Sequence, residues 1–164
     1  MKTLKYFTIK NSGIHNKGVF ASENIPKNTK IIGYVGKKIT KAVSEKRADK
    51  NLERSKSNPS HGAVYIFELN KKYDIDGNVS YNLARFINHS CNPNCFTEVT
   101  KGHIWIKALK DIKKGEELSY DYGYSIEDWQ DHPCKCGSHN CAGFIVDSRQ
   151  RWRLKNKILE LKSL

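Results

Sequence analysis

Five cysteines are the side chains of this 164-residue chain whose spacing most clearly suggests chemistry. Cys134, Cys136 and Cys141 form a C-x-C-x₄-C pattern, which offers three soft ligands, whereas zinc in a structural site usually takes four. The only other thiols are those of Cys91 and Cys95. An all-thiolate zinc site must therefore join the middle of the chain to its end. A reduced cluster without metal is the alternative, but nearby glycines favour the tight turns of a metal knuckle.

Two further segments carry polar side chains that could take part in a reaction. Asn88 and His89 follow two apolar residues, but an isolated Asn-His pair serves structural turns as readily as catalysis. Tyr120 and Tyr122, at a spacing of two, point to the same side of a predicted strand, so their hydroxyl groups would face one cavity. Tyrosines on strands are more often packing residues, so this spacing alone does not establish a catalytic site.

Composition indicates one compact domain with a very polar surface. The length suits a single hydrophobic core. The apolar fraction is 38% and the mean hydropathy −0.68, but 10% aromatic residues argue against disorder. No apolar run is long enough for a signal peptide or a membrane span, and an odd number of cysteines favours reduced thiols. We expect a soluble intracellular protein without a membrane partner, nuclear in a eukaryote and cytoplasmic or host-directed in a microbe.

The formal net charge of +12 and the pI near 9.5 indicate an acidic partner, such as nucleic acid or a chromatin-like complex. The alternative is a basic surface that is merely solvated, because net charge bears on association rather than on fold. The charge also supports a second hypothesis for function, a non-enzymatic zinc-containing module that binds nucleic acid.

The elements that must position these residues are mainly short strands. Apolar runs bounded by turn residues predict strands at residues 6–9, 19–21, 31–35, 63–69, 73–76, 104–109 and 118–122. One exposed helix is expected over residues 40–56, stopped by residues 57–59. A basic amphipathic helix is expected from residue 148 onward, where it would pack on the domain or bind a partner. The sequence therefore predicts a mostly β fold with a few helices.

Five motifs, taken in order, resemble the SET-domain protein lysine methyltransferases that carry a post-SET zinc knuckle. They occupy residues 14–21, 34–36, 85–95, 115–122 and 134–143. The resemblance runs from about residue 5 to residue 146 and is specific, because all five motifs occur in the family's order. One departure is Asn16, where the family often has glycine. Asparagine tolerates the left-handed backbone conformation, so we expect this segment to keep its shape.

The resemblance implies small curved β-sheets in which the Asn88 segment and the strand leading to Tyr122 thread together in a pseudoknot-like arrangement. It implies a SET domain at residues 5–123 and a post-SET zinc knuckle at 130–146, and it leaves a basic amphipathic C-terminal tail at 147–164 outside the resemblance. It also implies a set of residues that line an S-adenosylmethionine pocket, with Lys135 and either Phe144 or Ile145 over the adenine: Ile14, Lys17, Gly18, Tyr65, Arg85, Asn88, His89, Tyr122, Lys135, Phe144 and Ile145.

We expect Cys91 to complete the zinc site with Cys134, Cys136 and Cys141, which leaves Cys95 free. Four thiolates leave no open coordination position, so the zinc is expected to be structural.

The resemblance also assigns roles to three tyrosines. A free lysine has a pKa of about 10.4, and a narrow aromatic channel would disfavour its ammonium form by desolvation. Tyr122 resembles the family's catalytic tyrosine, and Tyr65 and Tyr120 resemble walls of the lysine channel. Tyr120 stands at a tyrosine-or-phenylalanine switch position, which favours mono- or dimethylation of a histone or histone-like protein. Methylation of a non-histone protein is the alternative, and the basic residues of 37–56 and the tail are expected to dock on DNA or an acidic face of the substrate complex.

Overall fold

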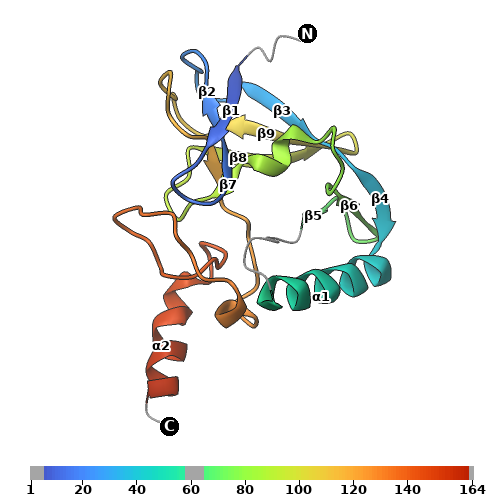
Figure 1. Cartoon of the computed structure of the whole chain (residues 1–164), viewed down its shortest axis with the longest axis vertical. Coiled ribbons are helices and arrows are strands. Elements are labelled where there is room, and N and C mark those ends of the chain that lie inside the picture. Colours follow the sequence, from blue (N-terminus) through green and yellow to red (C-terminus); the bar gives the residue numbers. More distant parts are fainter. Residues whose placement is uncertain (1–5, 58–64, 163–164) are drawn as a thin grey trace.

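The structure is a computed structural model that describes residues 6–57 and 65–162. Small sheets form its body, and two helices lie at its periphery (Figure 1). The elements are β1 (Phe7–Asn11), β2 (Lys17–Ala21), β3 (Lys30–Tyr34), β4 (Lys37–Thr40), α1 (Lys41–Ser57), β5 (Ile66–Glu68), β6 (Tyr73–Asp76), η1 (Leu83–Phe86), β7 (Asn88–His89), β8 (Cys95–Thr100), β9 (His103–Ala108), β10 (Ser119–Tyr120), η2 (Trp129–Asp131) and α2 (Arg151–Lys162). The predicted mostly β fold with a few helices is confirmed.

The pairing of β7 with β10 sets the topology around the polar motifs. These two strands run parallel, with Asn88 opposite Ser119 and His89 opposite Tyr120. The remaining strands in the described part of the chain form a β1-β2 hairpin and two three-stranded sheets, in the orders β3-β9-β8 and β4-β6-β5. The Asn88 segment therefore lies directly beside the tyrosine strand, as the sequence predicted.

The β8-β9 hairpin forms two of the three strands of the sheet β3-β9-β8, against which the core packs. Its turn residues Lys101 and Gly102 have φ values of 50° and 74°, which is the left-handed pair that a tight two-residue hairpin turn requires. Along β9 the side chains alternate in exposure, and Ile104, Ile106 and Ala108 are at most 2% exposed. The period-two pattern of this strand thus directs its apolar face into the protein.

Most predicted elements are present with small shifts of their ends. The exposed helix predicted over residues 40–56 is α1, and the helix predicted from residue 148 onward is α2. The strands β4, β7 and β8 were not predicted. The helix stop predicted at 58–59 and the first two residues of the strand predicted at 63–69 lie outside the described residues, as do residues 5, 163 and 164 at the predicted domain ends.

No helix in the described part of the chain has both the length and the apolar character needed to cross a bilayer.

Two clusters of buried apolar side chains hold the elements together. The larger lies among the sheets and includes Val19, Ile87 and Leu118. The smaller consists of Ile126, Trp129, Val146 and Leu154, with Ala142, Phe144 and Ile158 partly buried against it. Helix α2 therefore packs on the cysteine-rich region instead of standing free, which favours packing on the domain over its availability as a separate tail.

Gly36 marks a close approach between the chain leading into β4 and the end of β6. A Cβ at Gly36 would fall 2.1 Å from the backbone oxygen of Asp76, whereas a Cβ at Gly33 meets no atom nearer than 3.7 Å. Because paired backbone cannot move aside easily, Gly36→Ala is expected to lower the free energy of unfolding by about 1–3 kcal/mol. Gly33→Ala is the matched control, with an expected change below about 1 kcal/mol. Urea unfolding followed by tryptophan fluorescence measures both, and equal stabilities would contradict the packing argument.

Candidate active site and metal centre

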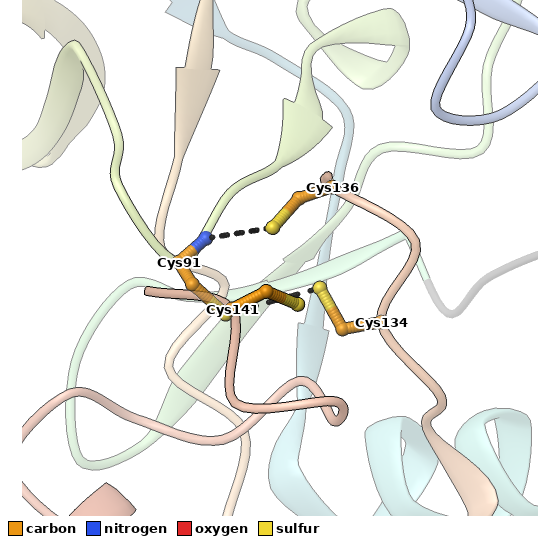
Figure 2. A group of neighbouring side chains, drawn as sticks. All are labelled: Cys91, Cys134, Cys136 and Cys141. Carbon is orange, nitrogen blue, oxygen red and sulfur yellow. Dashed lines mark hydrogen bonds between the residues drawn. The ribbon is translucent and has the colours of Figure 1, made fainter. Parts of the chain in front are cut away.

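Four thiols converge from two distant parts of the chain. The sulfur atoms of Cys91, Cys134, Cys136 and Cys141 lie within 4.8 Å of one another (Figure 2). The sulfur atoms of Cys91 and Cys134 are 3.8 Å apart, which matches the edge of about 3.8 Å in a tetrahedron with zinc–sulfur bonds of about 2.3 Å. The donor set and its spacing thus fit a tetrahedral zinc ion. The structure brings the middle and the end of the chain together, as the sequence predicted.

Backbone amides point at the sulfur atoms of this cluster. The amide of Cys91 donates to Sγ of Cys136, and the amide of Ala142 donates to Sγ of Cys91, each at 3.5 Å. Burial opposes ionisation of Cys136, but the donors on Cys91 and Ser138 lower its pKa to about 6. Cys95 lies outside the cluster, where burial raises its pKa to about 12. The local environment therefore favours the metal-binding thiolate at Cys136 and an inert thiol at Cys95.

A narrow cavity of about 30 Å³ lies among aromatic side chains. Its size leaves room for only one or two water-sized groups. The ring centroids of Tyr120 and Tyr122 are 4.9 Å apart, and those of Tyr122 and Tyr124 are 5.7 Å apart. The two tyrosines that were predicted from their spacing do face one cavity. The residues that line it are Tyr34, Tyr65, Ile66, Phe67, Arg85, Tyr120, Tyr122 and Tyr124.

The phenols of Tyr120 and Tyr122 are neutral hydrogen-bonding groups. Burial, with a smaller contribution from neighbouring tyrosines, raises the pKa of Tyr120 and of Tyr122 well above the usual value. The hydroxyl of Tyr122 donates to the carbonyl oxygen of Ile87 at 3.0 Å, which fixes its direction. An ammonium group entering such a cavity would lose hydration, so its pKa would fall. The cavity is therefore suited to a neutral amine.

Asn88 holds the turn between β1 and β2 in place. Its side-chain amide donates to Oε1 of Glu117 at 2.8 Å and to the carbonyl oxygen of Lys17 at 3.1 Å. The hydroxyl of Ser12 donates to the same carboxylate at 2.8 Å. A Cβ at Gly18 would fall 2.3 Å from Oε1 of Glu117, so a larger residue there would displace this carboxylate. Asn88, Lys17 and Gly18 are thus brought together around Glu117.

The backbone of this turn has the shape expected from its sequence. Asn16 has a φ of 41°, the left-handed conformation that asparagine was expected to accept. The amide of Ile14 donates to the hydroxyl of Ser12 at 2.9 Å, and the Ile14 side chain is half-buried. The turn is therefore ordered by side-chain contacts from other parts of the site.

Arg85 carries a buried donor that lacks an acceptor. Its Nε makes no hydrogen bond in the described structure, although it is shielded from solvent. The guanidinium lies 4.7 Å from the ring centroid of Phe86 and 5.9 Å from that of Tyr65. Buried donors are almost always paired in folded proteins, so an unpaired one at the edge of a cavity indicates a place for a ligand acceptor.

His89 connects the aromatic cavity to the cysteine cluster. It is 3% exposed. Its Nδ1 accepts the amide of Tyr122 at 3.2 Å, and its Nε2 lies 3.6 Å from Sγ of Cys91. Burial is the main reason that its pKa falls to about 4, so the ring is neutral at neutral pH. With Nδ1 accepting, the ring proton belongs on Nε2, where it donates to the sulfur.

Lys135 and the two alternatives predicted over the adenine, Phe144 and Ile145, all lie in the cysteine-rich region. Lys135 is exposed, between two of the cysteines. Phe144 packs edge-on against Trp129, with ring centroids 4.4 Å apart. Ile145 is half-buried, and its amide donates to the carbonyl oxygen of His132 at 2.8 Å. Their contact with a cofactor stays a prediction.

Sequence reasoning did not single out Glu117, Tyr124 or Arg151 as site residues. Tyr124 continues the spacing of two from Tyr120 and Tyr122, so its signal was present in the sequence. Glu117 belongs to a recognised motif, but a carboxylate beside another is usually a solvated surface residue. Arg151 is one of several basic residues near the start of α2, and no feature of the sequence distinguishes it from the others.

Comparisons with known proteins agree with this geometry. The SET domain family model matches residues 16–123. A protein named histone-lysine N-methyltransferase, H3 lysine-4 specific, from Aspergillus oryzae is 43% identical over 140 residues, which cover 82% of this chain and 11% of that protein. A protein of the same name from Saccharomyces cerevisiae is 39% identical over 140 residues, covering 82% and 12%. Histone-lysine N-methyltransferase trr from Drosophila melanogaster is 42% identical over 140 residues, covering 82% and 6%.

The chain spans only 11%, 12% and 6% of the lengths of these three curated relatives, respectively. The matched segment nevertheless contains both the Asn88 segment and the tyrosine strand, which lie side by side in the structure. The family model covers well over half of the chain, and the chain belongs to the SET-domain family.

Proposed function

We propose that this chain is a protein-lysine N-methyltransferase that transfers a methyl group from S-adenosylmethionine to a lysine of a histone or histone-like protein. The observation that carries the proposal is the narrow cavity of neutral tyrosines, which is joined through His89 to a cluster of four cysteines. The relatives named above are histone-lysine N-methyltransferases by name, and two of them are named as specific for H3 lysine 4.

Cys91, Cys134, Cys136 and Cys141 are proposed to hold one structural zinc ion. The fit rests on four sulfur atoms that lie within 4.8 Å of one another, on the 3.8 Å separation of the Cys91 and Cys134 sulfurs, and on the amides that donate to the cluster. With four thiolates in place no coordination position is open for a reacting group. The role of the cysteines is therefore to fix the C-terminal part of the chain against the segment that follows β7.

S-adenosylmethionine supplies, when bound, a methyl group on a positively charged sulfur. The unpaired Nε of Arg85 supports a ligand site at this edge of the cavity. Asn88 and Glu117 order the turn of the β1-β2 hairpin, so that its backbone is rigid before a ligand arrives. The residues proposed to line the pocket are Ile14, Lys17, Gly18, Tyr65, Arg85, Asn88, His89, Tyr122, Lys135, Phe144 and Ile145.

The tyrosines are proposed to prepare and orient the substrate amine. Aromatic walls exclude water, so the amine of a substrate lysine is favoured in its neutral, nucleophilic form. Tyr122 is the proposed catalytic tyrosine, because its hydroxyl is held by the carbonyl oxygen of Ile87. Tyr65 and Tyr120 narrow the channel so that the amine approaches along one direction. Alignment of reacting atoms at about 3–3.5 Å contributes several kcal/mol to lowering the barrier.

Tyr120 is proposed to limit the reaction to mono- or dimethylation. Its side chain is 7% exposed and its phenol stays neutral. A hydroxyl at this position occupies space and can bind a water molecule or the amine, which leaves less room for added methyl groups. The small volume of the cavity, about 30 Å³, supports this proposal.

The basic surface is proposed to dock on nucleic acid or on an acidic face of the substrate complex. Lys46 and Lys50 of α1 and Lys155 of α2 are exposed, and the chain carries a net charge of +12. A basic histone tail alone would be repelled by such a charge. A histone substrate would place the protein in the nucleus of a eukaryote, whereas in a microbe the substrate would be a histone-like protein or a protein of the host.

The same charge favours a second candidate function, a zinc-containing module that binds nucleic acid without catalysis. Isothermal titration of the zinc-loaded protein with S-adenosylmethionine separates the two, because only the enzyme should bind it. Labelled S-adenosylmethionine with core histones, bacterial histone-like proteins and whole lysate then distinguishes a histone from a non-histone substrate.

Tyr122→Phe is expected to lower kcat by about 100-fold or more, because it removes an oriented hydroxyl from the reacting centre. The KM for both substrates should change little. The matched control is Tyr81→Phe, since Tyr81 is 64% exposed. Transfer of labelled methyl groups to histone H3 measures both variants, and an unchanged kcat for Tyr122→Phe would remove this residue from the mechanism.

Tyr120→Phe is expected to shift the products toward higher methylation states, because it frees space beside the amine. Mass spectrometry of the product peptide over time gives the proportions of mono-, di- and trimethyllysine. Ready trimethylation by the native protein, with no change in the variant, would show that Tyr120 does not limit the product.

Cys136→Ser, or treatment with a strong chelator, is expected to remove zinc and to weaken S-adenosylmethionine binding by about tenfold or more, equivalent to about 1.4 kcal/mol. Cys95→Ser is the matched control, because the Cys95 thiol lies outside the cluster and donates to Oδ1 of Asn94, a bond that a hydroxyl can replace. Zinc content by mass spectrometry and binding by calorimetry are the measurements. Tight binding after confirmed metal loss would contradict the proposed structural role.

A further inference from the structure

Arg151, the first residue of α2, joins three separate segments of the chain. Its Nε donates to the carbonyl oxygen of Val146, its Nη1 to that of Cys91 and its Nη2 to Oδ2 of Asp121, each at 2.8 Å. The side chain is 16% exposed. A planar guanidinium is suited to such a set of directed bonds, and partial burial protects them from competition by water.

Asp121 is the acceptor that matters most for the aromatic cavity, because it lies between Tyr120 and Tyr122 in the chain. Its Oδ2 also accepts the amide of Ser148 at 2.9 Å, and its Oδ1 accepts the amide of Gly123 at 3.1 Å. A group that holds this carboxylate also holds the backbone from which both tyrosines project. Arg151 supplies the cation that balances its charge.

The bond to Cys91 connects the same guanidinium to the cysteine cluster. Cys91 contributes its sulfur to the cluster and its carbonyl oxygen to Arg151. One side chain therefore contacts the backbone of a proposed zinc ligand and the carboxylate of the tyrosine strand. The distance between these two segments is set in part by the rigid width of the guanidinium.

Helix α2 is anchored firmly enough to serve as a support for Arg151. Leu154 is 2% exposed and belongs to the smaller core cluster, and Ile158 packs against the same cluster. Nζ of Lys157 lies 3.4 Å from a carboxylate oxygen of Glu127. These contacts fix the first turns of the helix, so the position of the Arg151 backbone is determined.

We propose that Arg151 is a positioning residue for methyl transfer and that α2 is thereby part of the catalytic unit. It acts through Asp121 on Tyr120 and Tyr122 and through the Cys91 carbonyl on the cysteine cluster. This inference rests on the proposed function, because it assigns Arg151 a role in that same site.

Removal of the guanidinium leaves a partly buried carboxylate without its cation and two carbonyl groups without their donor. The tyrosine strand is then free to shift relative to the cysteine cluster, and a misplacement of about 1 Å can cost about 100-fold in rate. Lysine at this position keeps the positive charge, but its single ammonium group cannot donate in the fixed directions of the planar guanidinium. It should restore part of the function, because the attraction to Asp121 persists.

The test compares Arg151→Met, Arg151→Lys and the control Arg153→Met in the zinc-loaded chain of 164 residues. Arg153 is exposed on the same helix. On an isolated histone H3 peptide, which offers no nucleic acid or acidic face for the basic tail to bind, Arg151→Met is expected to lower kcat by about tenfold or more, with Arg151→Lys between it and the native protein and Arg153→Met unchanged. Kinetic constants are determined on protein whose zinc content matches the native protein. A native-like kcat in folded Arg151→Met would overturn the proposal.

Hydrogen exchange provides a measurement that does not need activity. The amides of Tyr122 and Gly123 are bonded within the site, whereas Ile106 lies in the core of β9. Arg151→Met, or Arg151→Lys where the first variant does not fold, should speed exchange at Tyr122 and Gly123 by about tenfold while Ile106 is unchanged. Equal changes at all three amides would show a merely structural role and overturn the proposal. An inactive native protein with the local exchange effect would instead count against the proposed function alone.

Discussion

The convergence of four thiols from the middle and the end of the chain is the constraint on which the rest of the site depends. Cys91 follows β7, and β7 pairs with β10, so the position of the cysteine cluster and the position of Tyr120 are linked over a few residues. His89 adds a second link, because its ring contacts both Sγ of Cys91 and the amide of Tyr122. A displacement of the cysteine cluster would therefore also displace the tyrosines that line the aromatic cavity.

Much of this arrangement could be predicted because its signals are local and periodic. The spacing of Tyr120 and Tyr122 placed both rings in one cavity, and the C-x-C-x₄-C pattern required a distant partner that is Cys91. Strand β7 could not be predicted from periodicity, because two polar residues carry no pattern. Glu117 and Arg151 were missed for a related reason, since a charged side chain becomes a structural residue only through partners that are far away in sequence.

Several acidic side chains form hydrogen bonds or ion pairs within the molecule. Glu117, Asp121 and Asp147 are each bonded within the molecule, to Asn88, Arg151 and Arg149 respectively. Asp74 likewise accepts a bond from the side chain of Lys41. These four carboxylates fix turns and strand ends, whereas other acidic side chains, among them Glu45, Asp49 and Glu53 of α1, stay exposed beside the lysines. The surface of α1 therefore carries charges of both signs, and the case for an acidic docking partner rests on the net charge of +12.

The site is assembled from segments that are far apart in the sequence, so its chemistry depends on folding. The tyrosine strand is held by His89 from the middle of the chain and by Arg151 from its end. Arg151 also donates to the carbonyl oxygen of Cys91, so its position is tied to the cysteine cluster. Thiolates in one small cluster repel one another unless a cation balances their charge. A metal that binds only the assembled cluster stabilises the folded form over the unfolded one. The proposed zinc ion would therefore also favour the arrangement in which His89 and Arg151 contact the tyrosine strand.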